Sequence, residues 1–135
     1  DEAGLFLVSL HVNSSSNSRD RGSLVFYQSS SPESLRLATL IHAALKGANP
    51  AGCGKPIGGD TLFVIRNTKV PTVLVEIGFL SNKEDRALMV DEKYRAELIA
   101  ALAAAIEEYY LSLTRRPEEP AAPMPGPARQ AGPQI

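Results

Sequence analysis

The sequence predicts an α/β layered domain, in which apolar strand segments alternate along the chain with amphipathic helices. The first strand segment is a nearly unbroken apolar run, LFLVSL, which is typical of a strand covered on both faces, as in a parallel sheet. The chain has 135 residues, about one domain's worth, and 44% of them are hydrophobic, which is enough for a globular core.

The first half of the body predicts two strands and a helix. The strands cover Leu5–Leu10 and Ser23–Tyr27, and a Ser/Asn-rich loop separates them. A helix follows because Ser31 can cap it and Pro32 fits the first helical position, where a missing N–H costs nothing. The helix is expected to end at Gly47. Its predicted apolar stripe consists of Leu35, Ala38, Ile41 and Leu45.

The second half predicts two further strands and two helices. After a Gly- and Pro-rich loop at Ala48–Gly59, strands are expected at Thr61–Ile65 and from Pro71 to Val75, the most buried of all. A capping box formed by Ser81 and Glu84 predicts a short helix.

The last predicted helix is long and starts at the cap residue Asp91, ending near Leu113. Its expected apolar stripe is Tyr94, Leu98, Ala101, Leu102, Ala105 and Tyr109. Composition then changes, because residues 117–135 hold six of the ten prolines. We therefore predict a domain over 1–114 and a Pro-rich disordered tail over 115–135.

Composition excludes several classes of function. Lys and Arg total 14 and Asp and Glu total 15, so the net charge of −1 gives no reason to expect a nucleic-acid partner. No apolar run approaches the ~20 residues that cross a bilayer. The single cysteine, Cys53, excludes an internal disulfide framework and a Cys-rich structural zinc site.

Two ionisable residues follow predicted strands. His11 comes after the first apolar strand and Glu76 after the strand at Pro71–Val75, so both are expected at the sheet edge where α/β proteins bind ligands. His11 can be a metal ligand, a general base or a histidine bonded to a carbonyl. Glu76 can be a proton shuttle in a dry cleft or the partner of Arg66 or Lys69 in an ion pair. Together they favour a hydrolytic centre, with or without a metal.

Three segments resemble the zinc-dependent N-acetylmuramoyl-L-alanine amidases. LVSLHVN at 7–13 is similar to that family's S-[IL]-H-x-N segment, and LFVIR at 62–66 to its L-x-V-[LI]-[RK] strand. PTVLVEIGFLSNKED at 71–85 is similar to the signature P-[AS]-V-L-V-E-x-G-F-[LI]-S-N-x-x-[DE]. The segments lie in the family's order, and the match covers about residues 4–112.

The resemblance implies a mostly parallel, twisted sheet flanked by helices, of the phosphorylase/hydrolase-like kind. It also implies a peptidoglycan hydrolase that cleaves the amide between the lactyl group of N-acetylmuramic acid and L-alanine. By position, His11 matches the family's last zinc-binding histidine, and Glu76 its catalytic glutamate. Zinc would activate a water, and Glu76 would take its proton and deliver it to the leaving amine.

Four other side chains are weaker candidates for a functional role. Asn13 is expected either to bind substrate or to shape its loop, and Arg66 either to grip a peptide carboxylate or to pair with Glu76 or Asp60. His42 is expected to be an ordinary, partly buried helix residue, and Cys53 an incidental thiol.

The sequence departs from the family's pattern at its start. Catalytic zinc normally has three protein ligands, and the family's other His and its Glu lie upstream of the segment that contains His11. We therefore expect a C-terminal part of a larger amidase domain, lacking the first strands of the sheet. Zinc binding through His11 alone is expected to be weak, and a chain without the other ligands can be inactive.

Partners and location follow from the same resemblance. The expected substrate is peptidoglycan, which places the protein in the secreted, periplasmic or cell-wall compartment. An incomplete sheet predicts an exposed apolar seam, which favours association with the missing N-terminal part or with a second copy. Two rival hypotheses are a non-catalytic, amidase-derived module that binds cell wall or regulates a partner, and a related zinc peptidase.

Overall fold

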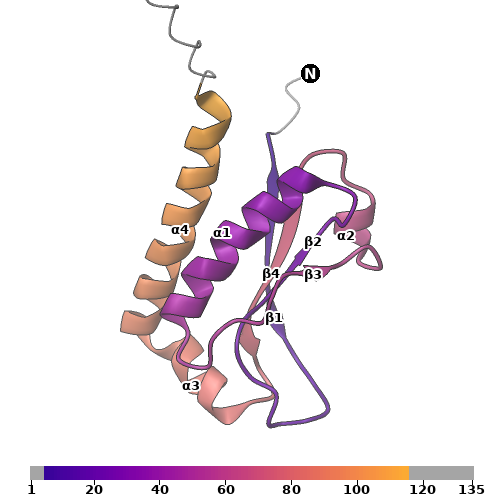
Figure 1. The fold of residues 1–135 in the computed structure, drawn as a ribbon. Helices are drawn as coiled ribbons and strands as arrows, with labels where there is room; N and C mark the ends of the chain where they lie inside the picture. Colours follow the sequence, from indigo (N-terminus) through magenta and orange to yellow (C-terminus); the bar gives the residue numbers. More distant parts are fainter. Residues whose placement is uncertain (1–4, 116–135) are drawn as a thin grey trace, which may run out of the picture.

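The computed structural model describes residues 5–115, which form a four-stranded sheet flanked by helices (Figure 1). The strands are β1 (Leu7–Asn13), β2 (Leu24–Tyr27), β3 (Ile57–Gly58) and β4 (Thr72–Phe79), in the spatial order β1-β4-β2-β3. β1 pairs with β4 and β2 with β3 in parallel, whereas β2 pairs with β4 antiparallel. The predicted α/β class is confirmed, with a sheet of mixed strand direction.

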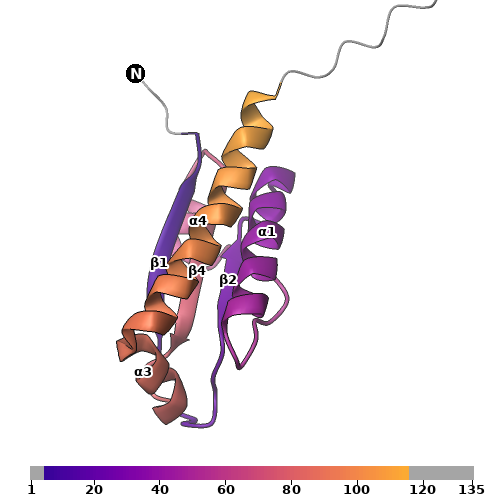
Figure 2. The same ribbon diagram turned by 90° about the vertical axis from the view of Figure 1, so that its left-hand side faces the viewer.

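Four helices complete the domain: α1 (Pro32–Ala48), α2 (Phe63–Arg66), α3 (Lys83–Val90) and α4 (Glu92–Thr114). α1 and α4 lie side by side against one face of the sheet (Figures 1 and 2). No helix within residues 5–115 is long and apolar enough to cross a membrane. The predicted tail at 115–135 lies, apart from its first residue, outside the described residues.

β4 is the central strand and carries the core. Its side chains alternate between the two faces, so that Val73 and Val75 point toward α1 and α4 and are fully buried with Val25 of β2. The remaining buried members of this cluster come from the helices: Leu37, Ala38, Ile41, Leu45, Tyr94, Leu98, Leu102, Ala105 and Tyr109. The prediction that this strand is the most buried one is confirmed.

The apolar stripe of α1 is shifted from the predicted one. Ser31 caps the helix as expected, but Leu35 is 41% exposed and Leu37 is fully buried. The reason is that Ser34 faces the sheet, where its hydroxyl accepts a hydrogen bond of 2.9 Å from the backbone N–H of Thr72. Leu35 lies one residue further, about 100° around the helix, and therefore points away from the core.

The predicted strand at Thr61–Ile65 is wrong, because its second half forms the short helix α2. Apolar β-branched runs suit a strand and a short buried helix equally, and here only Ile65 is fully buried. β3 takes the place beside β2 instead. The chain then turns at Gly59, where a Cβ atom would lie 2.8 Å from Ile65 and 2.9 Å from Phe26. Only glycine permits this close approach.

The capping box predicted for α3 is also wrong. Asn82, rather than Ser81, is the cap residue, and its side chain accepts a hydrogen bond from the backbone N–H of Asp85. The Ser81 hydroxyl instead accepts from the backbone N–H of Ser15, across the loop that follows β1. Asp91 caps α4 as predicted.

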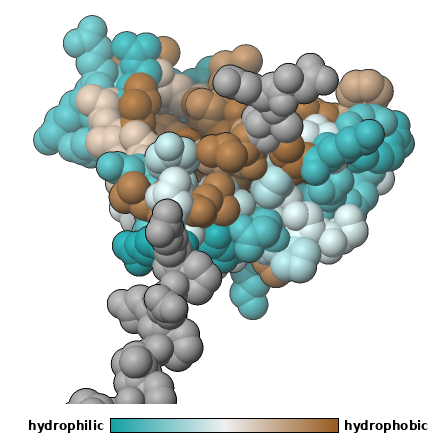
Figure 3. Space-filling view, turned by 90° about the horizontal axis from the view of Figure 1, so that it is seen from above, coloured by the Kyte–Doolittle hydropathy of each residue, from teal (hydrophilic) through white to brown (hydrophobic). Residues whose placement is uncertain are grey.

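β1 forms one edge of the sheet, and within residues 5–115 no strand pairs with its outer side. The expectation that this strand is covered on both faces is wrong, because Leu10 and Val12 are 59% and 49% exposed. Leu5, just before the strand, is exposed as well. Figure 3 looks onto the end of the molecule where β1 begins and shows apolar side chains gathered there between hydrophilic flanks. An edge strand with exposed Leu10 and Val12 agrees with the open edge expected of an incomplete sheet.

Two leucines of α1 test the shifted stripe. Leu37→Ala is expected to lower the free energy of unfolding by about 2–5 kcal/mol, because it leaves a cavity in the core. Leu35→Ala, two residues earlier on the exposed side, is expected to cost less than about 1 kcal/mol. Urea denaturation of both variants measures the difference, and equal losses would contradict the orientation of α1.

Candidate active site

His11 and Glu76 lie on adjacent parallel strands and are paired in register. The sequence placed each directly after its strand, which is wrong, because β1 continues to Asn13 and β4 to Phe79. Parallel strands lie about 4.8 Å apart and paired residues point to the same face. The two side chains are therefore neighbours on the sheet, as the predicted hydrolytic centre requires.

The face that carries them is the one opposite α1 and α4. Val75 points into the core, so the next residue, Glu76, points the other way, together with His11 and with Leu24 of β2. His11 is exposed. The described residues enclose no cleft here, so the dry cleft expected around Glu76 is not formed by residues 5–115.

Glu76 is the less solvated of the two residues. Its Oε2 atom is buried and has no hydrogen-bond partner within residues 5–115. Burial raises the pKa of the carboxyl group above its ordinary value, and the nearby charge of His11 acts in the opposite direction. The alternative of an ion pair with Arg66 or Lys69 is not realised, because neither residue forms one in the described part of the chain. A carboxylate with an unused, buried oxygen is available for proton transfer or for a cation.

Within residues 5–115 the imidazole of His11 makes one hydrogen bond. Its Nε2 atom lies 2.7 Å from the hydroxyl oxygen of Ser9, two residues earlier on the same face of β1. A neutral imidazole nitrogen can bind zinc, and the exposure of His11 leaves the ring accessible, so the residue fits one ligand of a zinc ion. Residues 5–115 contain no group of three His, Cys, Asp or Glu side chains placed to hold a metal, so they do not complete a catalytic zinc site.

The two predicted substrate-binding residues lie on different elements, Asn13 on β1 two residues after His11 and Arg66 on α2. Asn13 is the last residue of β1, and its side-chain oxygen accepts a hydrogen bond of 2.8 Å from the backbone N–H of Ser14. That contact matches the alternative in which Asn13 shapes the loop. Arg66 is exposed at the end of α2, and it forms no ion pair with any residue from 5 to 115. Its guanidinium group is therefore available to a ligand.

His42 and Cys53 are placed as expected. His42 is a partly buried residue of α1 and its Nδ1 lies 2.9 Å from the carbonyl oxygen of Gly54. Cys53 packs at the border of the core, and burial raises the pKa of its thiol to about 11. A thiol with so high a pKa is a poor nucleophile at neutral pH.

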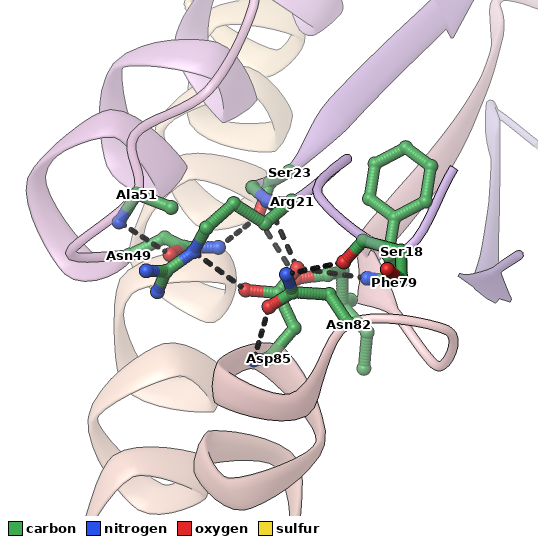
Figure 4. A network of polar contacts seen from close by, with 10 residues as sticks. Ser18, Arg21, Ser23, Asn49, Ala51, Phe79, Asn82 and Asp85 are labelled. Carbon is green, nitrogen blue, oxygen red and sulfur yellow. Dashed lines mark hydrogen bonds and ion pairs between the residues drawn. The ribbon is translucent and has the colours of Figure 1, made fainter. Parts of the chain in front are cut away.

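A buried carboxylate that sequence reasoning did not single out holds the loop after His11 in place. Asp85, in the first turn of α3, is 2% exposed, and its Oδ2 accepts 2.9 Å hydrogen bonds from the backbone N–H groups of Gly22 and Phe79 (Figure 4). Arg21 Nε lies 3.5 Å from the other oxygen. Gly78 lets the carboxylate approach, because a Cβ atom there would lie 3.2 Å from Oδ2.

Neighbouring polar residues extend this network on both sides. Asn82 donates through its side-chain nitrogen to the carbonyl oxygen of Ser18 (2.9 Å), so the turn after β4 grips the loop after β1 at a second point. Ser23 donates to the carbonyl oxygen of Ile77, and Asn49 donates to the Ser23 hydroxyl, both at 2.9 Å (Figure 4). In the sequence, this network could have been noticed only through Gly78 and Asp85, which are both positions of the signature at 71–85. No local sequence pattern shows which backbone groups Asp85 binds.

Comparison with known proteins identifies a family. Residues 2–108 match the family model described as "N-acetylmuramoyl-L-alanine amidase". The amidase LytC of Bacillus subtilis is 31% identical over 81% of this chain, which covers 22% of LytC. The germination-specific N-acetylmuramoyl-L-alanine amidase of the same organism is 28% identical over 87% of the chain, which covers 49% of that protein. The chain thus spans half or less of these two relatives.

Solved structures agree with the sequence matches. The CwlD amidase of Clostridioides difficile, in complex with the GerS lipoprotein, aligns with a TM-score of 0.76 at 28% identity. That alignment covers 84% of this chain and 57% of CwlD. The catalytic domain of CwlV from Bacillus (Paenibacillus) polymyxa aligns with a TM-score of 0.69 at 32% identity, over 78% of this chain and 57% of that one.

The buried carboxylate of α3 can be tested against its exposed neighbour. Asp85→Asn is expected to lower the free energy of unfolding by about 1.5–3 kcal/mol, because hydrogen bonds to a charged, buried acceptor are lost or weakened. Glu84→Gln makes the same chemical change one residue earlier on the surface, and is expected to change it by less than about 0.5 kcal/mol. Equal unfolding midpoints for the two variants would contradict the stabilising role of the Asp85 carboxylate.

Proposed function

Because the chain belongs to the N-acetylmuramoyl-L-alanine amidase family, we propose that it forms the part of a peptidoglycan amidase that contains Glu76 and His11. The reaction is hydrolysis of the amide between the lactyl group of N-acetylmuramic acid and L-alanine. The observation that carries this proposal is the in-register pair itself, with a buried Glu76 oxygen that has no partner in residues 5–115.

Glu76 is the proton carrier in this proposal. Its position on β4 fixes the carboxylate next to His11, and burial holds its pKa above the ordinary value, closer to the operating pH. The carboxylate takes a proton from the attacking water as the water oxygen bonds to the amide carbon. It then delivers that proton to the leaving nitrogen as the C–N bond breaks, which releases the amino group of L-alanine.

His11 is proposed as one ligand of a zinc ion. When bound, zinc lowers the pKa of a water molecule and polarises a carbonyl group. Because residues 5–115 hold no group of three candidate ligands, at least one further ligand of such a site is proposed to lie outside them. The contribution of β1 is to present the imidazole from a rigid strand, beside the carboxylate that moves the proton.

Substrate contacts and location complete the proposal. Arg66 offers a planar guanidinium fork with no ion pair in residues 5–115, which suits a peptide carboxylate. Asn13 is proposed to contribute through the loop that it begins. Because peptidoglycan is the substrate, the protein acts in the secreted, periplasmic or cell-wall compartment. The open edge of β1 is proposed to accept the remainder of an amidase domain or a second copy.

A second candidate function is a non-catalytic module that binds cell wall or a partner protein. The observation that favours it is the lack of a complete metal-ligand set within residues 5–115. The presence of both His11 and Glu76 in register argues for catalysis, because a binding module has no physical need for that pair.

The catalytic role of Glu76 is tested by Glu76→Gln in the native protein. This variant is expected to lower kcat/KM on purified peptidoglycan by about 10²–10⁴-fold, because an amide cannot carry the proton. The assay follows the L-alanine amino termini released while the glycan stays intact. Glu97→Gln, an exposed position on α4, is the matched control and is expected to retain full activity.

An unaltered rate for the Glu76 variant would exclude the proton-carrier role, whereas a wild-type protein that releases no amino termini from peptidoglycan would favour the binding module. Product analysis separates the remaining alternative. New amino termini other than that of L-alanine would identify a peptidase that acts on peptide bonds.

A further inference from the structure

The short helix α2 lies on the face of the sheet that carries Glu76. Figure 1 shows α2 and the two long helices on opposite sides of the sheet. On the face of Glu76, Leu74 of β4 lies two residues before Glu76 and pairs with Phe26 of β2. α2 covers this pair, because a Cβ atom at Gly59 would touch both Ile65 and Phe26, and Leu74 is only 6% exposed. Two residues of a strand span about 7 Å, so α2 lies beside the candidate site.

The outer side of α2 carries an aromatic ring. Phe63 is 76% exposed, whereas Ile65, two positions later, is the buried residue of this helix. Two positions are about 200° around a helix, so the ring points away from the sheet. The other exposed aromatic residue between 5 and 115 is Tyr110, at 43%. Because water solvates a phenyl ring poorly, Phe63 is available for an apolar contact.

Positive charge lies next to this ring. Arg66 follows Phe63 by three positions and is therefore on the same side of the helix. Arg66 and Lys69, in the turn after α2, are both exposed, and neither forms an ion pair within residues 5–115. The nearest carboxylate in the sequence, Asp60, accepts hydrogen bonds from the hydroxyl and the backbone N–H of Ser29. The surface of α2 therefore complements an anion that also carries apolar groups.

We propose that Phe63 is a substrate-binding residue, which packs against the peptide half of the substrate beside the carboxylate contact of Arg66. The identity of the substrate rests on the proposed function. A stem peptide begins at the scissile amide with L-alanine and continues with D-glutamate, so it presents a methyl group and then a carboxylate. An extended chain advances about 3.5 Å per residue, so a peptide that starts at Glu76 reaches α2 with its second residue.

Charge favours the peptide half over the glycan half. The carboxyl of the lactyl group is taken up in the scissile amide, so the glycan side of the substrate is neutral. A neutral sugar gives no use to the cations at Arg66 and Lys69, whereas a peptide carboxylate pairs with the planar guanidinium fork.

Binding is tested with L-alanyl-D-glutamate, which lacks the muramoyl amide and is not cleaved by the proposed reaction. NMR titration of the native protein is expected to shift the ring signals of Phe63. The diamide of the same dipeptide keeps the methyl group and loses the charge, and is expected to bind about tenfold more weakly. Arg66→Gln is expected to abolish this difference. Chitotriose, a neutral glycan probe, is expected to leave the Phe63 signals unchanged.

Variants of the ring separate a binding role from a structural one. Phe63→Ala is expected to weaken dipeptide binding about five- to tenfold and to raise KM for peptidoglycan by a similar factor. The kcat value is expected to be retained, because the contact is the same before and during the reaction. Phe63→Tyr is expected to restore both values. Tyr110→Ala removes an exposed ring on α4, across the sheet, and is the matched control with no expected effect.

Four results decide the proposal. Unchanged dipeptide affinity in Phe63→Ala, or equal binding of the dipeptide and its diamide, would overturn it. Tighter binding of chitotriose than of the dipeptide would assign the ring to the glycan instead. A lowered unfolding midpoint of Phe63→Ala would show that the ring packs within the protein and would also overturn the proposal. A native protein that binds the dipeptide through Phe63 but releases no L-alanine amino termini would refute the proposed function alone.

Discussion

The parallel pairing of β1 with β4 is the constraint on which the rest of the structure depends. A shift of one residue in this register would turn the side chains of one strand to the other face and separate His11 from Glu76. The register is held by the burial of Val73 and Val75 under α1 and α4, because exposing either valine would cost about 1.5–3 kcal/mol. The same packing that makes the core therefore sets the neighbours on the opposite face.

The two ends of this strand pair are fixed in different ways. Near its start, Ser34 of α1 binds the backbone of Thr72, and the carbonyl oxygen of Pro71 accepts from Leu7. At its other end, the Asp85 carboxylate joins the loop after β1 to the last residue of β4 through the backbone amides of Gly22 and Phe79. His11 and Glu76 lie between these anchors, which suits groups that must keep their separation during proton transfer.

The sequence was sufficient for the central strand, the two long helices and the proximity of His11 and Glu76. The caps at Ser31 and Asp91 predicted the helices. The apolar run at 71–75 predicted the strand, and the places of His11 and Glu76 after predicted strands brought the two residues together. It was insufficient where local patterns are ambiguous or where the partner is distant. The run before Arg66 fits a strand or a short helix, and in the structure it forms α2 while β3 pairs with β2.

The contacts of Asp85 show why a distant partner is hidden from sequence reasoning. One of its partners is a backbone amide 63 residues away, and an acidic residue in the first turn of a helix also has a purely local explanation. The Ser9 contact was hidden for a related reason. A serine two residues before a histidine is a common sequence pattern. The two side chains form a hydrogen bond here because both lie on the same open face of β1.

The central claim is that His11 and Glu76 act as one unit, and a double-mutant cycle tests it most directly. His11→Ala, Glu76→Gln and the double variant are compared by kcat/KM for release of L-alanine amino termini from peptidoglycan. Residues that act as a unit are expected to be non-additive, so that the double variant loses no more activity than the worse single one. Losses that multiply would show that the two side chains work independently and would contradict the account.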